Sequence, residues 1–256
     1  MILKPERSNI ETLSLIVDKV DNKIPFCFTR LGDGEICVLK NLDPEIYDTG
    51  ITYSFLKKYW GIDYGSEDFE RLRRIIIKSV ENSDFLGIYD FEKRFKNRNK
   101  KNEKMCAKWR IEKKLLNDMS INIDEKYLSS FDFVRSYEFG KVENFLKVFK
   151  NTKIDMITSD RNILTDKRFV ENKNINITYV DGNLKFANID SKALLKRIKG
   201  DLVIYGLSTG MKDFGVDVKL ELGKCAIDVG SLMLAWTGVS PRKIYDVEFP
   251  HAINKR

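Results

Sequence analysis

The chain has 256 residues, a length that suits one domain with a single hydrophobic core, and it carries a formal net charge of +7. Its 43% hydrophobic and 32% charged residues are typical of a soluble globular protein. No apolar run reaches about 18 residues, so no membrane-spanning helix is expected. The positive charge favours anionic partners: nucleotides, phosphorylated glycans, anionic lipid surfaces or nucleic acid.

Three further features limit the class of protein. Residues 1–7 contain a proline and charges where an export signal needs an apolar core. The four cysteines lack metal-type spacing, which favours reduced thiols and a cytoplasmic location. The single histidine, His251, argues against a Ser-His-Asp hydrolase or a histidine-rich metal centre. A bound metal would therefore be held by oxygen atoms, which favours Mg²⁺ or Mn²⁺ over zinc.

Short apolar runs alternate with amphipathic stretches along the whole chain. The runs predict strands at 24–30, 85–89, 131–134, 154–158, 175–180, 202–205 and 225–229. Helical spacing predicts helices at 9–20, 67–80, 105–116, 141–149, 191–198 and 212–222, the last ended by Gly223. This alternation favours an α/β fold that is Rossmann-like, with a mostly parallel sheet and helices on both faces. We treat residues 1–256 as one domain.

One segment, residues 92–104, is almost entirely polar and strongly basic. It is interpreted either as a solvated loop or as a flap that covers an anionic ligand.

The first candidate site is the turn after the predicted strand 24–30. Asp33 and Glu35 stand one residue apart between two glycines, Gly32 and Gly34, which leave room for a ligand near the backbone. Two such carboxylates can share one hard divalent cation, with Arg30 close enough to pair with phosphates. The alternative is a plain turn in which Asp33 caps the following helix.

Three other strand ends carry polar or glycine-rich residues, and ligands of open α/β sheets collect at such ends. The loop 206–210 could cradle a phosphate with its backbone N–H groups and with Ser208 and Thr209, or it could be an ordinary turn. Asp228 could bind a ribose or sugar hydroxyl or cap a helix. The segment 158–162 fits either a site wall or a capped helix start, and Arg135 is a further cation near this edge.

The residues resemble a known family. Arg30-Leu31-Gly32-Asp33-Gly34-Glu35 resembles the Arg-φ-Gly-Asp-Gly-Glu signature of GT-D-type glycosyltransferases, whose DxE motif binds a divalent metal. Residues 206–231 are similar to the C-terminal block of that family, with its Asp-φ-Gly motif at Asp228-Val229-Gly230. Residues 133–137 are similar to an aromatic-Arg segment in the middle of the family. This chain departs from the family in lacking a Gly-Pro-Thr-Ala-type loop and in having Ser231 where a histidine often follows the Asp-φ-Gly motif.

The resemblance implies a hexosyltransferase of polysaccharide biosynthesis with a GT-D-type fold. Such an enzyme moves a sugar from a nucleotide sugar, with UDP expected, to a glycan, glycolipid or glycoprotein. Asp33 and Glu35 would hold Mn²⁺ or Mg²⁺, and Arg30 would assist them in catalysis. The residues implied in binding the donor are Gly32, Gly34, Arg135, Gly206, Ser208, Thr209, Gly210, Asp228 and Gly230.

Two other classes of function stay open. Paired carboxylates also serve metal-dependent phosphatases and nucleotidyltransferases, although the Asp-x-Asp-x-Thr pattern of one phosphatase class is missing here. A basic nucleic-acid-binding module ranks last because the chain has no recognised motif of that kind, and nucleic acid is not an expected partner. Peripheral association with a membrane and formation of a homo-oligomer are left open.

Overall fold

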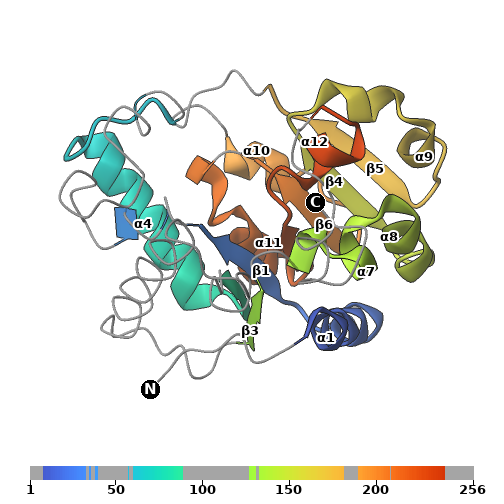
Figure 1. The fold of residues 1–256 in the computed structure, drawn as a ribbon. Helices are drawn as coiled ribbons and strands as arrows, with labels where there is room; N and C mark the ends of the chain where they lie inside the picture. Colours follow the sequence, from blue (N-terminus) through green and yellow to red (C-terminus); the bar gives the residue numbers. More distant parts are fainter. Residues whose placement is uncertain are drawn as a thin grey trace, which may run out of the picture.

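A parallel β-sheet forms the centre of the molecule (Figure 1). The computed structural model describes residues 8–32, 35, 38–39, 57, 60–88, 127–130, 133–181, 190–207 and 209–239. Its seven strands are ordered β3-β2-β1-β7-β6-β4-β5, and each pair of neighbours is parallel. The strands are β1 Cys27–Leu31, β2 Phe85–Ile88, β3 Tyr127–Ser130, β4 Ile154–Thr158, β5 Ile175–Tyr179, β6 Leu202–Gly206 and β7 Cys225–Asp228. The predicted Rossmann-like α/β fold is confirmed.

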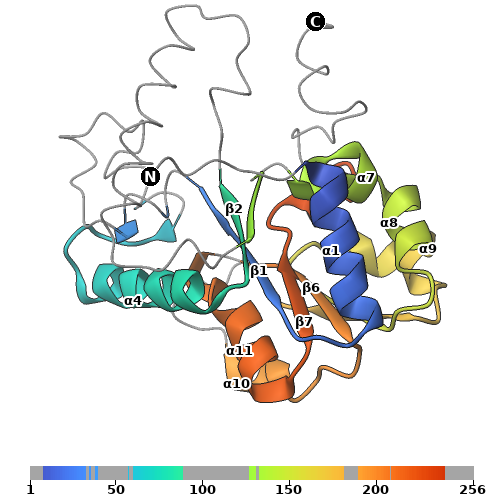
Figure 2. The ribbon, with the colours of Figure 1, turned by 90° about the horizontal axis from the view of Figure 1, so that it is seen from below.

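Helices cover both faces of the sheet (Figure 2). The α-helices are α1 Asn9–Asp21, α4 Glu67–Asn82, α7 Tyr137–Gly140, α8 Val142–Val148, α9 Lys167–Val170, α10 Ser191–Leu195, α11 Phe214–Leu222 and α12 Leu232–Trp236. Three short 3₁₀ helices are η3 Phe133–Arg135, η4 Arg161–Thr165 and η5 Thr209–Met211. Helices α4, α10 and α11 lie on one side of the sheet, and α1, α7, α8 and α9 lie on the other.

The two faces of the sheet are buried in two separate clusters of apolar side chains. Along β6, Leu202 and Ile204 point into the cluster beneath α1, α7 and α8. Val203 and Tyr205 point the other way, against α10 and α11. This period of two is the geometry of any strand, and because both faces are covered, the strand has an apolar residue at nearly every position.

The ends of the helices follow from local side chains. Ser8 and Glu11 form a reciprocal capping box at the start of α1, and the Ser66 hydroxyl accepts the Phe69 N–H at the start of α4. Gly223 ends α11 with φ of 62°, the left-handed conformation that glycine adopts without steric cost, as the sequence predicted.

The structure corrects two predicted strands. Residues 131–134 were expected to form a strand, but the third strand is Tyr127–Ser130, and Phe133–Arg135 forms η3. Phe133 and Val134 are buried, so their apolar side chains reflect burial in the core and do not indicate a strand. The first strand begins at Cys27 instead of Ile24, because the Ile24 N–H still bonds to the Lys19 carbonyl of α1.

The predicted helix at 105–116 and the basic segment 92–104 lie outside the described residues. The single domain over 1–256 stays a prediction. None of the described helices has the length and hydropathy needed to cross a membrane.

Candidate functional site

The candidate site lies where the carboxyl ends of β1 and β7 meet. These strands are the first and last of the sheet in sequence, yet they are neighbours at its centre. From β1 the chain continues to β2 on one side, whereas β7 is reached from β6 on the other. Loops diverge at such a switch point, and open α/β sheets bind their ligands there. The Arg30–Glu35 turn and the Asp228–Ser231 turn therefore lie at the same place.

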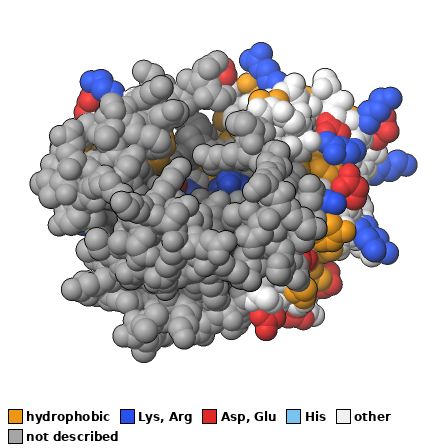
Figure 3. Space-filling model, in the orientation of Figure 1, with side chains coloured by type: hydrophobic (Ala, Val, Ile, Leu, Met, Phe, Trp, Pro, Cys, Tyr) orange, Lys and Arg blue, Asp and Glu red, His pale blue; other side chains and the backbone are white. Residues whose placement is uncertain are grey.

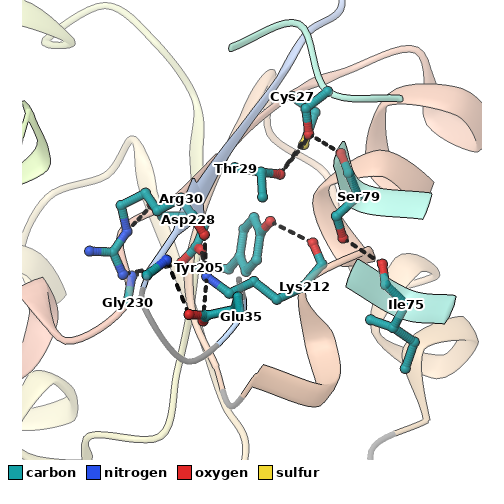
Figure 4. A network of polar contacts seen from close by, with 12 residues as sticks. Cys27, Thr29, Arg30, Glu35, Ile75, Ser79, Tyr205, Lys212, Asp228 and Gly230 are labelled. Atoms are coloured by element: carbon teal, nitrogen blue, oxygen red, sulfur yellow. Dashed lines mark hydrogen bonds and ion pairs between the residues drawn. The ribbon is translucent and has the colours of Figure 1, made fainter. Parts of the chain in front are cut away.

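Arg30 joins the two strands. Its side chain is buried, and its Nε donates to the Asp228 carbonyl oxygen at 3.1 Å. Its Nη2 lies 3.8 Å from Asp228 Oδ1, so the guanidinium also forms an ion pair with that carboxylate (Figure 4).

Glycine is required at two positions around Arg30. A Cβ atom at Gly230 would lie 1.7 Å from Arg30 Nη2, and the residue has φ of 51°. A Cβ atom at Gly206 would lie 2.3 Å from the Gly230 carbonyl oxygen. The loop after β6 and the loop after β7 are thus in direct contact, with the guanidinium packed against Gly230.

Lys212 lies between the Arg30–Glu35 turn and β7. Its ammonium donates to the Arg30 carbonyl at 2.8 Å and to Asp228 Oδ2 at 2.6 Å. Glu35 Oε1 is 3.3 Å away. The lysine is 7% exposed, so water contributes little to its solvation, and these three oxygens replace it.

The Glu35 carboxylate also supports its own turn. Oε2 accepts the Gly32 N–H at 3.1 Å, while Oε1 faces Lys212. The described residues after the turn, Glu35, Val38 and Leu39, are helical, which agrees with a helix starting there. Asp33 and Gly34, which the sequence placed at the centre of the site, lie outside the described residues.

Asp228 is a buried anion held by two cations and a backbone amide. Burial alone would raise its pKa, but the Lys212 ammonium and the Arg30 guanidinium outweigh burial and lower the pKa below its usual value. The Gly230 N–H donates to Oδ1 at 2.9 Å and adds to this effect. Both carboxylate oxygens are engaged within the protein, so the first role of Asp228 is to hold Arg30 and Lys212.

Arg135 belongs to the same edge. It ends η3, is buried, and its Nη2 approaches Ser231 Oγ at 3.4 Å. The middle segment of the chain thereby contacts the turn after β7. Gly140 packs against the Arg135 backbone, where a Cβ atom would lie 2.8 Å from both Cα and C.

The loop 206–210 differs in part from the expected phosphate cradle. The strands and helix predicted at 202–205, 212–222 and 225–229 are present as β6, α11 and β7, but Thr209 and Gly210 of the loop form the start of η5 and not the start of α11. Helix α11 begins only at Phe214, four residues after Gly210, so its first N–H groups do not belong to this loop. Gly210 is buried; Ser208 lies outside the described residues, and the proposed contacts of Thr209 stay a prediction.

The fourth predicted strand end, 158–162, has the structure of a capped helix start. The Asp160 carboxylate accepts the Asn162 N–H at 3.0 Å and a hydrogen bond from the Thr237 hydroxyl. Its polar residues are thus used to begin η4.

A second polar network, on the α4 side of β1, contains no charged group. The Ser83 hydroxyl donates to the Ser79 carbonyl at 2.5 Å, and Thr29 Oγ1 is 2.6 Å from that hydroxyl. Burial raises the pKa of the neighbouring Cys27 thiol to about 11. Cys27 is therefore an unreactive core thiol.

The oxygens of the site suit a hard cation in kind. Two carboxylates and a carbonyl, from Glu35, Asp228 and Arg30, converge on one point, and Lys212 provides the positive charge there. Within the described part of the chain, no three His, Cys, Asp or Glu side chains are grouped as a metal site. The predicted metal pair requires Asp33 in addition to Glu35. The two carboxylates of that pair, Asp33 and Glu35, are oxygen ligands of the kind that suits Mg²⁺ or Mn²⁺.

The face seen in Figure 3 is hollowed near its centre, and Lys or Arg side chains are visible there among the described residues. Elsewhere on the described surface of this view, basic and acidic side chains are interspersed. Positive charge inside a hollow favours an anionic ligand.

Comparisons with known proteins agree with this geometry. The arrangement is that of a glycosyltransferase fold. Over residues 8–236 the chain matches the family described as GT-D fold-like domain, and it belongs to that family. No curated protein sequence matches the chain.

Solved structures with the same fold include two of a domain of unknown function, number 1792. One is described as having a distinct glycosyltransferase fold; it is 14% identical, with a TM-score of 0.55, and covers 97% of this chain and 93% of its own. Another is described as a new glycosyltransferase from Streptococcus sanguinis. It is also 14% identical, with a TM-score of 0.51, over 95% of this chain and 91% of its own. Likeness at this identity establishes the fold.

Sequence reasoning missed the role of Lys212. The ion pair with Asp228 spans 16 residues and the bond to the Arg30 carbonyl spans 182, so no local spacing could reveal them. The one available signal was a lysine that lies between the buried Met211 and Phe214 in sequence.

Proposed function

We propose that the protein is a metal-dependent glycosyltransferase that moves a sugar from a nucleotide sugar, with UDP as the expected nucleotide, to a glycan, glycolipid or glycoprotein. The main support is the convergence of the Arg30–Glu35 turn and the Asp228–Gly230 turn at the switch point of a GT-D-type sheet. Each turn carries one of the family-like motifs, and Arg30 bonds them together.

The charges of the site suit a diphosphate leaving group. Arg30, Arg135 and Lys212 carry three positive charges, and Glu35 and Asp228 carry two negative charges, so these described side chains sum to +1. Negative charge builds on the β-phosphate as the sugar departs, and fixed positive charge in a buried site stabilises it. A divalent ion held by Asp33 and Glu35 would add Lewis-acid stabilisation of the same oxygens.

The side chains of this chain have distinct parts in that proposal. Arg30 orients the β1 turn through Asp228, Glu35 presents its carboxylate beside that turn, and Arg135 lies at the neighbouring strand end. Gly206 and Gly230 let the Gly230 carbonyl and the Arg30 guanidinium pack closely against the backbone, which holds the two turns and Arg30 together.

The test is turnover of nucleotide sugars with substituted carboxylates. A panel of UDP-, GDP-, CMP- and dTDP-sugars with Mn²⁺ is incubated with the protein, and the released nucleotide is measured. Asp33→Asn and Glu35→Gln should each reduce the rate by about 100-fold or more, since each removes a contribution to transition-state charge stabilisation. Glu221→Gln, an exposed carboxylate of α11, is the matched control and should leave the rate unchanged.

Two results would contradict the proposal. One is an unchanged rate in both site variants or in excess chelator. The other is release of inorganic phosphate or pyrophosphate in place of a nucleoside diphosphate, which would indicate a metal-dependent phosphoester enzyme.

A further inference from the structure

Lys212 differs from an ordinary buried lysine in the number and kind of its partners. An ammonium group has three N–H donors. Three oxygens surround this one at 2.6, 2.8 and 3.3 Å: Asp228 Oδ2, the Arg30 carbonyl and Glu35 Oε1. They come from both turns of the site and from β1. The ammonium therefore donates two hydrogen bonds, to Asp228 and to the Arg30 carbonyl, and forms an ion pair with Glu35, so it joins three separate groups of the site.

Other lysines packed against α11 lack this environment. Lys219, on the same helix, bonds to Asp84 and to the Asn82 carbonyl, and its side chain is 22% exposed. Lys78 pairs with Asp213 and Asp217, and 43% of its side chain is exposed. Water can replace a lost partner at both of these positions. At Lys212, where 8% of the side chain is exposed, it cannot.

Two carboxylates and a carbonyl around one point form the donor set that proteins offer to a hard metal cation. Here a covalently attached ammonium provides the charge. Without it, Glu35 and Asp228 would face each other in a buried place with only Arg30 to offset them.

We propose that Lys212 is a built-in cation that positions Glu35 and Asp228, in the place that a divalent ion would otherwise take between them. It acts as a positioning residue, through its contacts with the two carboxylates and the Arg30 carbonyl. The inference rests on the proposed function only for the part that Glu35 plays in catalysis.

The experiment measures how the melting temperature responds to divalent cations, with no sugar donor present. Lys212→Met keeps the length of the side chain and removes its charge, and Lys219→Met, on the helix that follows Lys212, is the matched control. In chelator, Lys212→Met should melt about 10 °C or more below the unsubstituted protein, because the buried Asp228 and the partly buried Glu35 lose a shared counter-charge. Millimolar Mg²⁺ or Mn²⁺ should restore about half of that loss, since the ion can occupy the three-oxygen position.

The control should behave differently. Lys219→Met should melt a few degrees lower at most, and its response to the ions should equal that of the unsubstituted protein. A merely structural role for Lys212 predicts the same destabilisation without recovery by cations. If cations stabilise Lys212→Met no more than Lys219→Met, the proposal is overturned.

A double variant decides the case in which Lys212→Met does not fold. Lys212→Met with Asp228→Asn removes the ammonium and one of the stranded carboxylates together. It should fold, melt at a higher temperature than Lys212→Met, and respond to cations no more than the control. An unfolded double variant would overturn the charge-balance argument.

This outcome is separable from that of the proposed function, because no sugar transfer is measured. If Asp33→Asn and Glu35→Gln leave nucleotide-sugar turnover unchanged, the proposed function fails, whereas recovery of Lys212→Met by cations would still establish the built-in cation. Full loss of turnover in those variants, without recovery of Lys212→Met by cations, would support the proposed function and overturn the built-in cation.

Discussion

Two clusters of ion pairs in the described part of the chain, one around Lys212 and one around Lys78, differ in the exposure of their lysines. The carboxyl-edge cluster consists of Arg30, Glu35, Lys212 and Asp228, whose side chains are 4–13% exposed. The helix-pair cluster between α4 and α11 consists of Lys78, Asp213 and Asp217; its carboxylates are 20% and 13% exposed, but its lysine is 43% exposed and stays in contact with water.

The difference in exposure gives the two clusters different energetics. An exposed ion pair contributes about 0–1 kcal/mol, since each charge is nearly as well solvated by water. Removing one member of a buried pair costs about 3–5 kcal/mol, because the other charge is left without solvation. The same chemistry therefore supports stability at the helix pair and fixes geometry at the carboxyl edge.

The largest expected difference between the clusters is the loss of unfolding free energy when one carboxylate is removed from each. Asp228→Ala should lower the free energy of unfolding by about 3–5 kcal/mol, since it strands Arg30 and Lys212. Asp217→Ala should cost about 1 kcal/mol or less, because Lys78 keeps Asp213 and water. Urea unfolding monitored by circular dichroism measures both values, and equal losses would show that exposure does not distinguish the clusters.

A smaller effect tests how tightly Arg30 is packed. Gly230 and Gly223 both have left-handed backbones, with φ of 51° and 62°, but a Cβ atom at Gly223 meets nothing within 4 Å. Gly223→Ala should cost about 1 kcal/mol for the backbone conformation alone. Gly230→Ala should cost about 3 kcal/mol, because it also displaces the guanidinium from Asp228. The difference between the two unfolding free energies isolates the crowding, and a difference near zero would mean that Arg30 moves aside freely.

The smallest effect is a contrast in pH dependence. The pKa of Asp228 is lowered in the folded protein, so its stabilising contribution is present above about pH 4 and is lost as the pH falls further. Burial raises the pKa of Asp213, with Lys78 opposing it, so its contribution is present at low pH and is lost as the pH rises above about 4.

Unfolding free energies measured from pH 3 to pH 7 check this contrast. Asp228→Asn should weaken the loss of stability toward acid, and Asp213→Asn should strengthen the gain of stability with rising pH, by less than about 1 kcal/mol. The slopes are compared instead of the absolute values, because each substitution also removes a hydrogen bond. Equal slopes in the two variants would contradict the opposite pKa directions.

The elements that sequence predicted correctly are those fixed by neighbouring residues. The apolar runs at 154–158 and 202–205 coincide with β4 and β6, and Gly223 ends α11, because periodicity and φ preference are local properties. The run at 131–134 failed because a buried 3₁₀ turn and a buried strand are equally apolar. Nothing local distinguishes them.

The position of most candidate residues in the fold was predictable from the sequence, but their contacts were not. Arg30, Glu35, Arg135, Gly206, Asp228 and Gly230 are indeed brought to one edge, since the carboxyl ends of parallel strands meet there. The partners of each carboxylate depend on how two distant loops pack, and that is set by tertiary structure. Whether Asp33 and Glu35 hold a metal stays a prediction.

The adjacency of β1 and β7 has a consequence for folding. During synthesis, almost two hundred residues are added after β1 before its neighbour β7 is made. Until β7 inserts, one side of β1 has unpaired backbone amides, and Arg30 has no carboxylate at position 228. Contacts of such long range close slowly and late. Catalytic competence would then be the last property the nascent polypeptide acquires, and any intermediate lacking its final strand would expose an aggregation-prone central edge.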